Sequence, residues 1–174
     1  MNNVFKPLIS GIDNLIVRLC GWTHIPYTTT NFLYISKHRY KGKTLQLKNS
    51  TIINKGDIVI EIHIDNKNLK NINTTSYVNL VRSFKSEINV LKKCFTEQQN
   101  FKNVKAVYGI SAFFHITSRC GFETMEIQNP IRRIFTSIWE NLLRHVLKTS
   151  KNKLRKNFVI SKECWISKDD LLHL

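Results

Sequence analysis

The clearest indication of the fold of this chain is the run Ile58-Val59-Ile60-Glu61-Ile62-His63-Ile64-Asp65, along which two kinds of residue alternate. A period of two predicts a β-strand with two different faces. Its isoleucines form one face, which we expect in the core, and Val59, Glu61, His63 and Asp65 form the other. The strand therefore predicts a sheet with one apolar face and one polar face.

Patterns on both sides of this strand predict further strands and helices. Apolar and aromatic runs between turn residues predict strands at 31–40, 44–47, 58–65, 104–114, 122–127 and 158–161. Apolar residues at three-and-four spacing, and capping residues, predict helices at about 4–20, 75–96 and 130–148 and a terminal helical turn at 166–172. Lys41-Gly42-Lys43 is expected to be a hairpin connection. We expect an α+β fold: a small, mostly antiparallel sheet covered by two or three amphipathic helices.

Length and charge limit the class of protein. A chain of 174 residues fits one domain and can bury a core without a disulfide or metal. Its formal charge of +15 favours polyanionic partners such as anionic lipid, acidic polymers or nucleic acid. An AT-rich genome, which enriches Lys and Asn without selection for binding, is the alternative explanation.

The cysteines and the N-terminal segment indicate the compartment. The cysteines show neither a CxxC pair nor a histidine at ligand spacing, so we expect buried thiols, no metal and no cofactor: Cys20, Cys94, Cys120 and Cys164. The apolar stretch from Leu8 to Leu19 is interrupted by Asp13, Asn14 and Arg18, which argues against a signal peptide or a membrane span. We expect a cytoplasmic protein, with a peripheral position at the cytoplasmic membrane as an extension of that expectation.

Several stretches resemble the YkoP-like domain family of bacterial proteins. The matching stretches are Tyr40-Lys41-Gly42, the run from Lys55 to Asn66, Gly121-Phe122-Glu123 before Asn129-Pro130, and Trp165 to Leu172. The resemblance implies a single domain over 1–174, with an N-terminal helix at about 4–20 and a basic tail at about 148–174. Members occur alone or after polysaccharide deacetylase domains, which implies a role in cell-envelope polysaccharide metabolism. None of these stretches is a catalytic signature.

The first candidate site is Glu61, His63 and Asp65. Ionisable side chains two residues apart on one strand face can act on a common ligand, and a histidine between carboxylates suits acid–base chemistry. The alternative is a solvated face on which the carboxylates meet lysines of a neighbouring strand.

The second candidate site lies in the connection that follows the strand at 104–114. Arg119 offers a bidentate fork to an anionic group, and Glu123 is a possible partner. Cys120 has no visible base beside it, so we interpret it as a structural thiol.

The third candidate is the helix from Pro130 with the basic tail that follows it. Such a helix can lie on an anionic membrane, or it can be a core helix with a solvated charged face. The residues that would contact a membrane or polyanion are Arg132, Arg133, Arg144, Lys151, Lys153, Arg155 and Lys156.

The sequence leaves three functional hypotheses. The preferred one is a non-catalytic binding domain of envelope polysaccharide metabolism, acting at the membrane surface or on an anionic polymer or sugar phosphate. The second is a small enzyme that uses His63 with Glu61 or Asp65 on an anionic substrate held by Arg119. The third is a non-specific nucleic-acid-binding protein, which lacks a known binding motif here.

Overall fold

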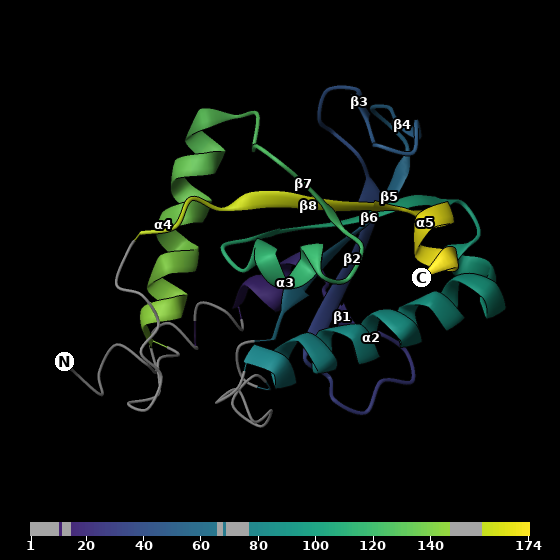
Figure 1. Cartoon of the computed structure of the whole chain (residues 1–174), viewed down its shortest axis with the longest axis horizontal. Helices are drawn as coiled ribbons and strands as arrows, with labels where there is room; N and C mark the ends of the chain where they lie inside the picture. Colours follow the sequence, from purple (N-terminus) through teal and green to yellow (C-terminus); the bar gives the residue numbers. More distant parts are fainter. Residues whose placement is uncertain (1–10, 12–14, 66–67, 69–76, 147–157) are drawn as a thin grey trace.

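The computed structural model describes residues 11, 15–65, 68, 77–146 and 158–174. Their centre is an open six-stranded sheet in the order β1-β2-β5-β6-β8-β7 (Figure 1). Its strands are β1 (Thr23–His24), β2 (Leu33–Arg39), β5 (Ile58–Ile64), β6 (Val104–Ser111), β8 (Lys162–Ser167) and β7 (Glu123–Met125). Only β5 and β6 run parallel; the other neighbours are antiparallel. The expected α+β class with a mostly antiparallel sheet is confirmed.

A second, two-stranded sheet lies between β2 and β5 in the sequence. It pairs β3 (Leu45–Gln46) with β4 (Ile52–Ile53). The prediction that Lys41-Gly42-Lys43 joins two paired strands is wrong, because β2 pairs with β5 instead. Backbone bonds from Tyr40 to Asp57 and from Gly56 to Tyr40 extend that pairing, so the small sheet is an excursion from a long hairpin.

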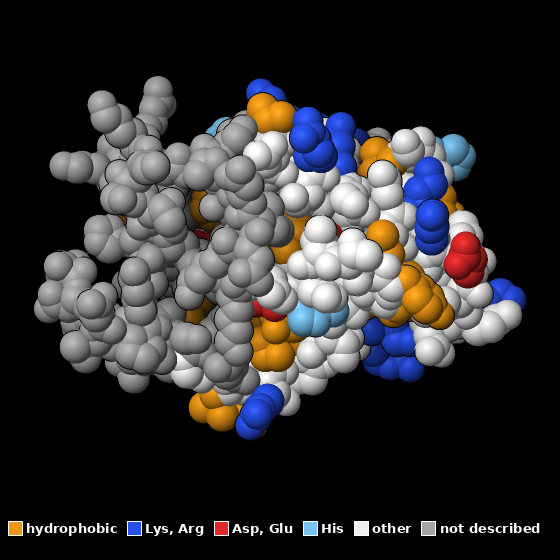
Figure 2. All heavy atoms as spheres, turned by 90° about the horizontal axis from the view of Figure 1, so that it is seen from below, with side chains coloured by type: hydrophobic (Ala, Val, Ile, Leu, Met, Phe, Trp, Pro, Cys, Tyr) orange, Lys and Arg blue, Asp and Glu red, His pale blue; other side chains and the backbone are white. Residues whose placement is uncertain are grey.

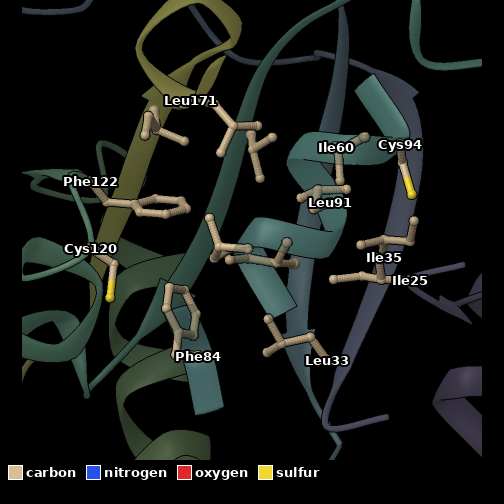
Figure 3. Close-up of a cluster of buried hydrophobic side chains, with 14 of the residues drawn as sticks. Ile25, Leu33, Ile35, Ile60, Phe84, Leu91, Cys94, Cys120, Phe122 and Leu171 are labelled. Carbon is tan, nitrogen blue, oxygen red and sulfur yellow. The ribbon is translucent and has the colours of Figure 1, made fainter. Parts of the chain in front are cut away.

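One face of the six-stranded sheet carries the larger core. It is covered by α2 (Tyr77–Glu97) together with the shorter α3 (Phe114–Ser118) and α5 (Lys168–His173). A short 3-10 helix, η2 (Gln99–Phe101), follows α2. Phe84 and Leu91 of α2 belong to the same buried cluster as Ile60 of β5 (Figure 3). The alternating isoleucines of β5 therefore point into this core, as expected.

The opposite face of the sheet is divided between two covers. Near the β3–β4 sheet, Val59, Tyr108 and Trp165 form a second buried cluster with residues of that small sheet. Farther along, α4 (Pro130–Val146) lies near the sheet and contacts β6 (Figure 1). Asn129 caps α4, since its Oδ1 accepts from the Arg132 amide at 3.0 Å.

The C-terminal segment contributes more to the sheet than the sequence indicates. The strand predicted at residues 158–161 is wrong, because these residues form no strand. The strand β8 at Lys162–Ser167 follows them and lies between β6 and β7 in the sheet. The terminal helix α5 begins after Ser167, whose Oγ accepts from the Asp170 amide at 2.9 Å. Residues assigned to a basic tail thus complete the sheet.

The N-terminal helix expected at 4–20 lies partly outside the described residues. Residues 15–20 are helical, and Leu15 and Leu19 are exposed. Among the described residues, no helix combines the length and apolar character needed to cross a membrane.

Candidate functional site

A network of ionisable side chains occupies the middle of the second sheet face. Glu61 of β5 points toward α4, where Arg132 Nη2 lies 3.6 Å from its Oε1. The same guanidinium reaches Glu163 of β8, with Nη1 3.8 Å from Oε1. Tyr108 of β6 donates or accepts a hydrogen bond with His38 Nε2 at 3.2 Å. The network therefore joins the helix to four strands, β2, β5, β6 and β8, and leaves Arg132 between two carboxylates.

Burial shifts the proton affinities of this network. It raises the pKa of the Glu61 carboxyl, while Tyr108 and Arg132 oppose the rise. It also raises the pKa of the Tyr108 phenol, which the neighbouring Glu61 raises further. Burial opposes the charge on Arg132, but Glu61 and the other partners outweigh it, so the pKa of Arg132 is raised. Arg132 is thus a firmly charged partner for the carboxylates.

His63 lies beside this network in an unusual environment. Its ring stacks on Trp22 with ring centroids 3.5 Å apart and an interplanar angle of 11°. Burial, with the positive charges of His38 and Arg132, lowers the pKa of His63 to about 3. Its Nε2 is buried and has no hydrogen-bond partner among the described residues, and Glu61 Oε2 at 3.8 Å is too distant to supply one. At neutral pH the His63 imidazole is therefore uncharged, and its Nε2 makes no hydrogen bond with any described residue.

A cavity of about 230 Å³ opens next to these side chains. Pairing between the parallel strands stops after Glu61 and Tyr108, and the cavity lies where β5 and β6 continue beyond that point. Gly109 forms part of its wall, and a Cβ there would lie 2.9 Å from the Ile62 carbonyl oxygen. The polar groups that line the cavity are Glu61, His63, Ser111, Thr117, Arg132, Thr136 and Glu140. Ligands commonly bind at the carboxyl ends of parallel strands.

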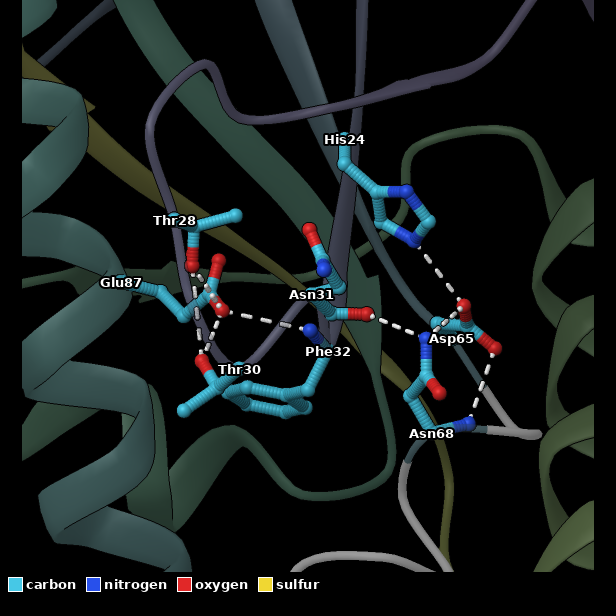
Figure 4. Close-up of polar contacts among 8 residues, drawn as sticks. All are labelled: His24, Thr28, Thr30, Asn31, Phe32, Asp65, Asn68 and Glu87. Atoms are coloured by element: carbon cyan, nitrogen blue, oxygen red, sulfur yellow. Dashed lines mark hydrogen bonds and ion pairs between the residues drawn. The ribbon is translucent and has the colours of Figure 1, made fainter.

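Asp65 does not join this group. It is 2% exposed, and its Oδ2 lies 3.0 Å from His24 Nε2 (Figure 4). Both the amide and the side chain of Asn68 donate to it. The structure therefore unites two of the three residues of the first candidate site and places the third at the end of β5, where it fixes the chain around β1.

A buried carboxylate that the sequence analysis missed lies nearby. Glu87 of α2 is fully buried, and its Oε1 accepts from Thr28 Oγ1 at 2.6 Å, from Thr30 Oγ1 and from the Phe32 amide at 3.2 Å (Figure 4). It holds the loop between β1 and β2, in which Tyr27 and Asn31 adopt positive φ. That loop leads back to β1 and to the Trp22 and His24 side chains.

The second candidate site is separated from the cavity. Arg119 is exposed at the end of α3, on the side of the sheet that carries α2, and does not line the cavity. Glu123 of β7 accepts from the Lys48 amide at 3.0 Å, which ties β7 to the β3–β4 excursion. Cys120 is buried, and burial raises the pKa of its thiol, as a structural role requires. A ligand-binding role for Arg119 and Glu123 stays a prediction.

The orientation of α4 is the main surprise of the structure. Four of its large apolar residues face away from the sheet and are 79%, 60%, 70% and 55% exposed: Ile131, Ile134, Phe135 and Ile138. Its other face makes polar contacts, since Ser137 Oγ accepts from the Ser161 amide and Asn141 bonds the backbone of Val159. For these residues the core-helix interpretation is wrong, because the apolar stripe is turned outward.

The basic residues of the third candidate have different surroundings. Arg132 lies in the network, and Arg133 pairs with Glu126 at 3.8 Å. The side chain of Arg144 and the residues Lys151, Lys153, Arg155 and Lys156 lie outside what the structure describes. On the face shown in Figure 2, Lys and Arg side chains stand in separate groups with few acidic ones among them.

Most residues of the network could not be predicted from the sequence. His38, Tyr108 and Glu163 lie on strands, but their convergence depends on strand order, and no short motif links them. Trp22 had no periodic pattern to mark it. Among the described residues, no group of three or more His, Cys, Asp or Glu side chains could hold a metal ion.

Fold and site together define an open α+β sheet domain with a cavity beneath an outward-facing amphipathic helix. A family model described as the YkoP domain matches residues 2–174. The chain therefore belongs to the YkoP domain family, which confirms the resemblance found in the sequence. No curated protein and no solved structure matches it.

The lowered pKa of His63 predicts an acid-sensitive fold. In the unfolded chain His63 binds a proton below about pH 6.5, but in the folded state it stays neutral down to about pH 3. The free energy of unfolding therefore falls as the pH drops toward 3. Between pH 7 and pH 5 we expect this residue to cost about 2 kcal/mol of unfolding free energy. Urea denaturation of the wild type and of His63→Phe, which keeps an aromatic ring beside Trp22, measures the difference.

The raised pKa of Glu61 acts in the opposite direction, since it favours the folded state as pH falls. Both proteins keep Glu61, so the comparison isolates His63. Parallel stability curves for the two proteins between pH 7 and pH 5 would show that His63 is not buried in its neutral form.

Proposed function

We propose that this YkoP domain is a non-catalytic binding module of cell-envelope polysaccharide metabolism that docks on an anionic membrane surface. The observation that carries the docking is the outward apolar stripe of α4: Ile131, Ile134, Phe135 and Ile138. The envelope context is supported by the family resemblance, because members of the family occur after polysaccharide deacetylase domains. The proposal gives α4 the role of a surface anchor.

An amphipathic helix binds a bilayer when its apolar face enters the headgroup boundary and its basic residues meet anionic lipid. Here the polar face of α4 is already used against the sheet, so the apolar stripe is left for another surface. The sequence that follows α4 is rich in cations: Lys148, Lys151, Lys153, Arg155 and Lys156. Each cation near an anionic surface contributes about 1 kcal/mol.

Charge also selects lipid over a second copy of the chain. Two chains of formal charge +15 that met through α4 would bring like charges together. An anionic bilayer would instead neutralise them. The chemistry of the stripe and its surroundings therefore fits a lipid surface.

The acid–base enzyme is the weaker alternative. A general acid or base works best with a pKa near the operating pH, whereas the pKa of His63 is about 3. Asp65 is engaged by His24 and Asn68, and Arg119 lies away from the cavity. The convergence of Glu61 and His63 is better suited to binding than to proton transfer.

Co-sedimentation with vesicles tests the membrane proposal. We expect binding to phosphatidylglycerol–phosphatidylcholine vesicles, weaker binding to pure phosphatidylcholine, and a decrease as salt rises. The double substitution Ile131→Ser and Phe135→Ser should lower partitioning at least ~10-fold, because each side chain loses roughly 1.5–3 kcal/mol of apolar burial. Both residues are exposed, so the fold should change little.

Val78→Ser is the matched control, since Val78 is 59% exposed on α2, a different helix. It should bind vesicles like the wild type. Failure of the wild type to bind anionic vesicles at moderate salt would overturn the proposal. So would wild-type binding by the double variant, or a dimer in solution that the double substitution dissociates without any vesicle binding.

A further inference from the structure

The cavity beneath α4 has a mainly apolar lining that includes several polar groups. Trp22, Trp139 and core side chains such as Phe84 form most of its wall, and Glu61 and His63 lie among its polar groups. A ligand that fits such a wall has an apolar body and a small polar group. The apolar stripe of α4 is a separate feature, since none of its four residues lines the cavity.

The charge of the cavity is opposite to that of the whole chain. Among the described residues its charged lining groups are the carboxylates of Glu61 and Glu140, the latter accepting from the Ala112 amide at 3.5 Å, and the guanidinium of Arg132. That guanidinium also faces Glu163, so it is shared between two carboxylates. His63 contributes no charge at neutral pH. Because Arg132 is shared between Glu61 and Glu163, it does not fully neutralise Glu61, so beside Glu61 a cation is favoured over an anion.

The unsatisfied Nε2 of His63 indicates which ligand group the cavity would bind. His63 Nε2 and Glu61 Oε2 are 3.8 Å apart, and in the part of the chain that the structure describes no group forms a hydrogen bond with this buried nitrogen. In the tautomer of the neutral ring with its proton on Nδ1, Nε2 is an acceptor, so a ligand atom with several hydrogens can donate to both at once. A protonated amine has three N–H donors and no acceptor, which matches a carboxylate and a neutral imidazole nitrogen. Buried polar atoms in folded proteins are normally satisfied, so a partner at this place is expected.

We propose that the cavity between β5, β6 and α4 binds an amphipathic primary amine, with the amino group between Glu61 and His63 and the apolar body against Trp22 and Trp139. Glu140 adds negative charge to the same cavity. The site differs from the anionic-ligand site expected from the sequence, because Arg119 does not line the cavity and Arg132, which does, is already paired with carboxylates.

Three compounds that share one apolar body test the charge preference. 2-Phenylethylamine is a cation, 2-phenylethanol is neutral and phenylacetate is an anion, and titration calorimetry or NMR of the full chain measures their affinities. We expect the amine to bind at least ~10-fold more tightly than the alcohol, as one charge-assisted hydrogen bond provides. Phenylacetate should bind more weakly than the alcohol.

Substitutions of the carboxylates locate the site. Glu140→Gln and Glu61→Gln should each weaken amine binding at least ~10-fold and leave the alcohol nearly unchanged. Glu126→Gln is the matched control, since Glu126 pairs with Arg133 and Lys162 outside the cavity, and it should bind the amine like the wild type. Two cavity variants are used so that misfolding of one still leaves a test.

Tighter binding of phenylacetate than of the amine would overturn the inference. So would wild-type amine affinity in the folded Glu140→Gln and Glu61→Gln proteins, or no binding of any of the three compounds at millimolar concentration. These outcomes are separate from the vesicle experiment, because the compounds are soluble and the α4 stripe is unchanged in both variants.

Discussion

Glu87→Ala should lower the free energy of unfolding by about 4 kcal/mol, because it removes the acceptor for three buried or partly buried donors. The Phe32 amide and the Thr28 and Thr30 hydroxyls would remain without their carboxylate. The loop they hold includes Tyr27 and Asn31 at positive φ, a backbone conformation that persists only where contacts fix it. Chemical denaturation monitored by circular dichroism measures the loss.

Glu97→Ala is the matched control, because Glu97 is the last residue of α2, away from the loop that Glu87 holds, and is exposed. It should change the unfolding free energy by no more than about 0.5 kcal/mol. Glu87→Gln keeps an acceptor oxygen and should fall between the two. An Ala variant as stable as the control would mean that the loop does not depend on Glu87.

Trp165→Ala should cost about 3–5 kcal/mol, the range for removing a large aromatic side chain from a core. Trp165 is fully buried, stacks on Tyr108 with centroids 4.3 Å apart and meets Tyr40 edge-on. Its Nε1 also donates to Glu163 at 3.0 Å. The substitution therefore opens a cavity and frees the carboxylate that helps to hold Arg132.

Trp165→Phe retains an aromatic ring but not the indole N–H, and it should lose clearly less stability than the Ala variant. Phe158→Ala, at a residue that is 60% exposed, should be close to neutral. Thermal unfolding of the four proteins gives the comparison. A loss for Trp165→Ala no larger than that for Phe158→Ala would contradict the stacked cluster on the second sheet face.

Much of the fold follows from local patterns. The alternation at 58–65 predicts β5 and its core face correctly, and Asn129-Pro130 predicts the start of α4. β8 was missed because Cys164-Trp165-Ile166 is buried on both faces, so it lacks the alternation that marks a half-buried strand. The two-residue strands β1 and β4 are too short to carry a pattern.

The site was predicted only in part, for a physical reason. Alternation places Glu61 and His63 on one strand face, but it cannot say what faces them across space. The periodicity of α4 identifies the apolar side of the helix but does not show whether that side faces the sheet or the solvent. Polar contacts of Arg132, Ser137 and Asn141 decide that orientation, and they depend on residues far away in the sequence.

The insertion of β8 between β6 and β7 has a kinetic consequence. β6 is largely buried and apolar, and it pairs with β8 along six residues that lie far from it in the sequence. Pairings between distant segments form late and slowly, because loop closure must precede them. Until residues 162–167 arrive, the hydrogen-bonding edge of β6 is open to any other extended chain. Nascent or partly unfolded molecules are therefore most exposed to aggregation along this edge.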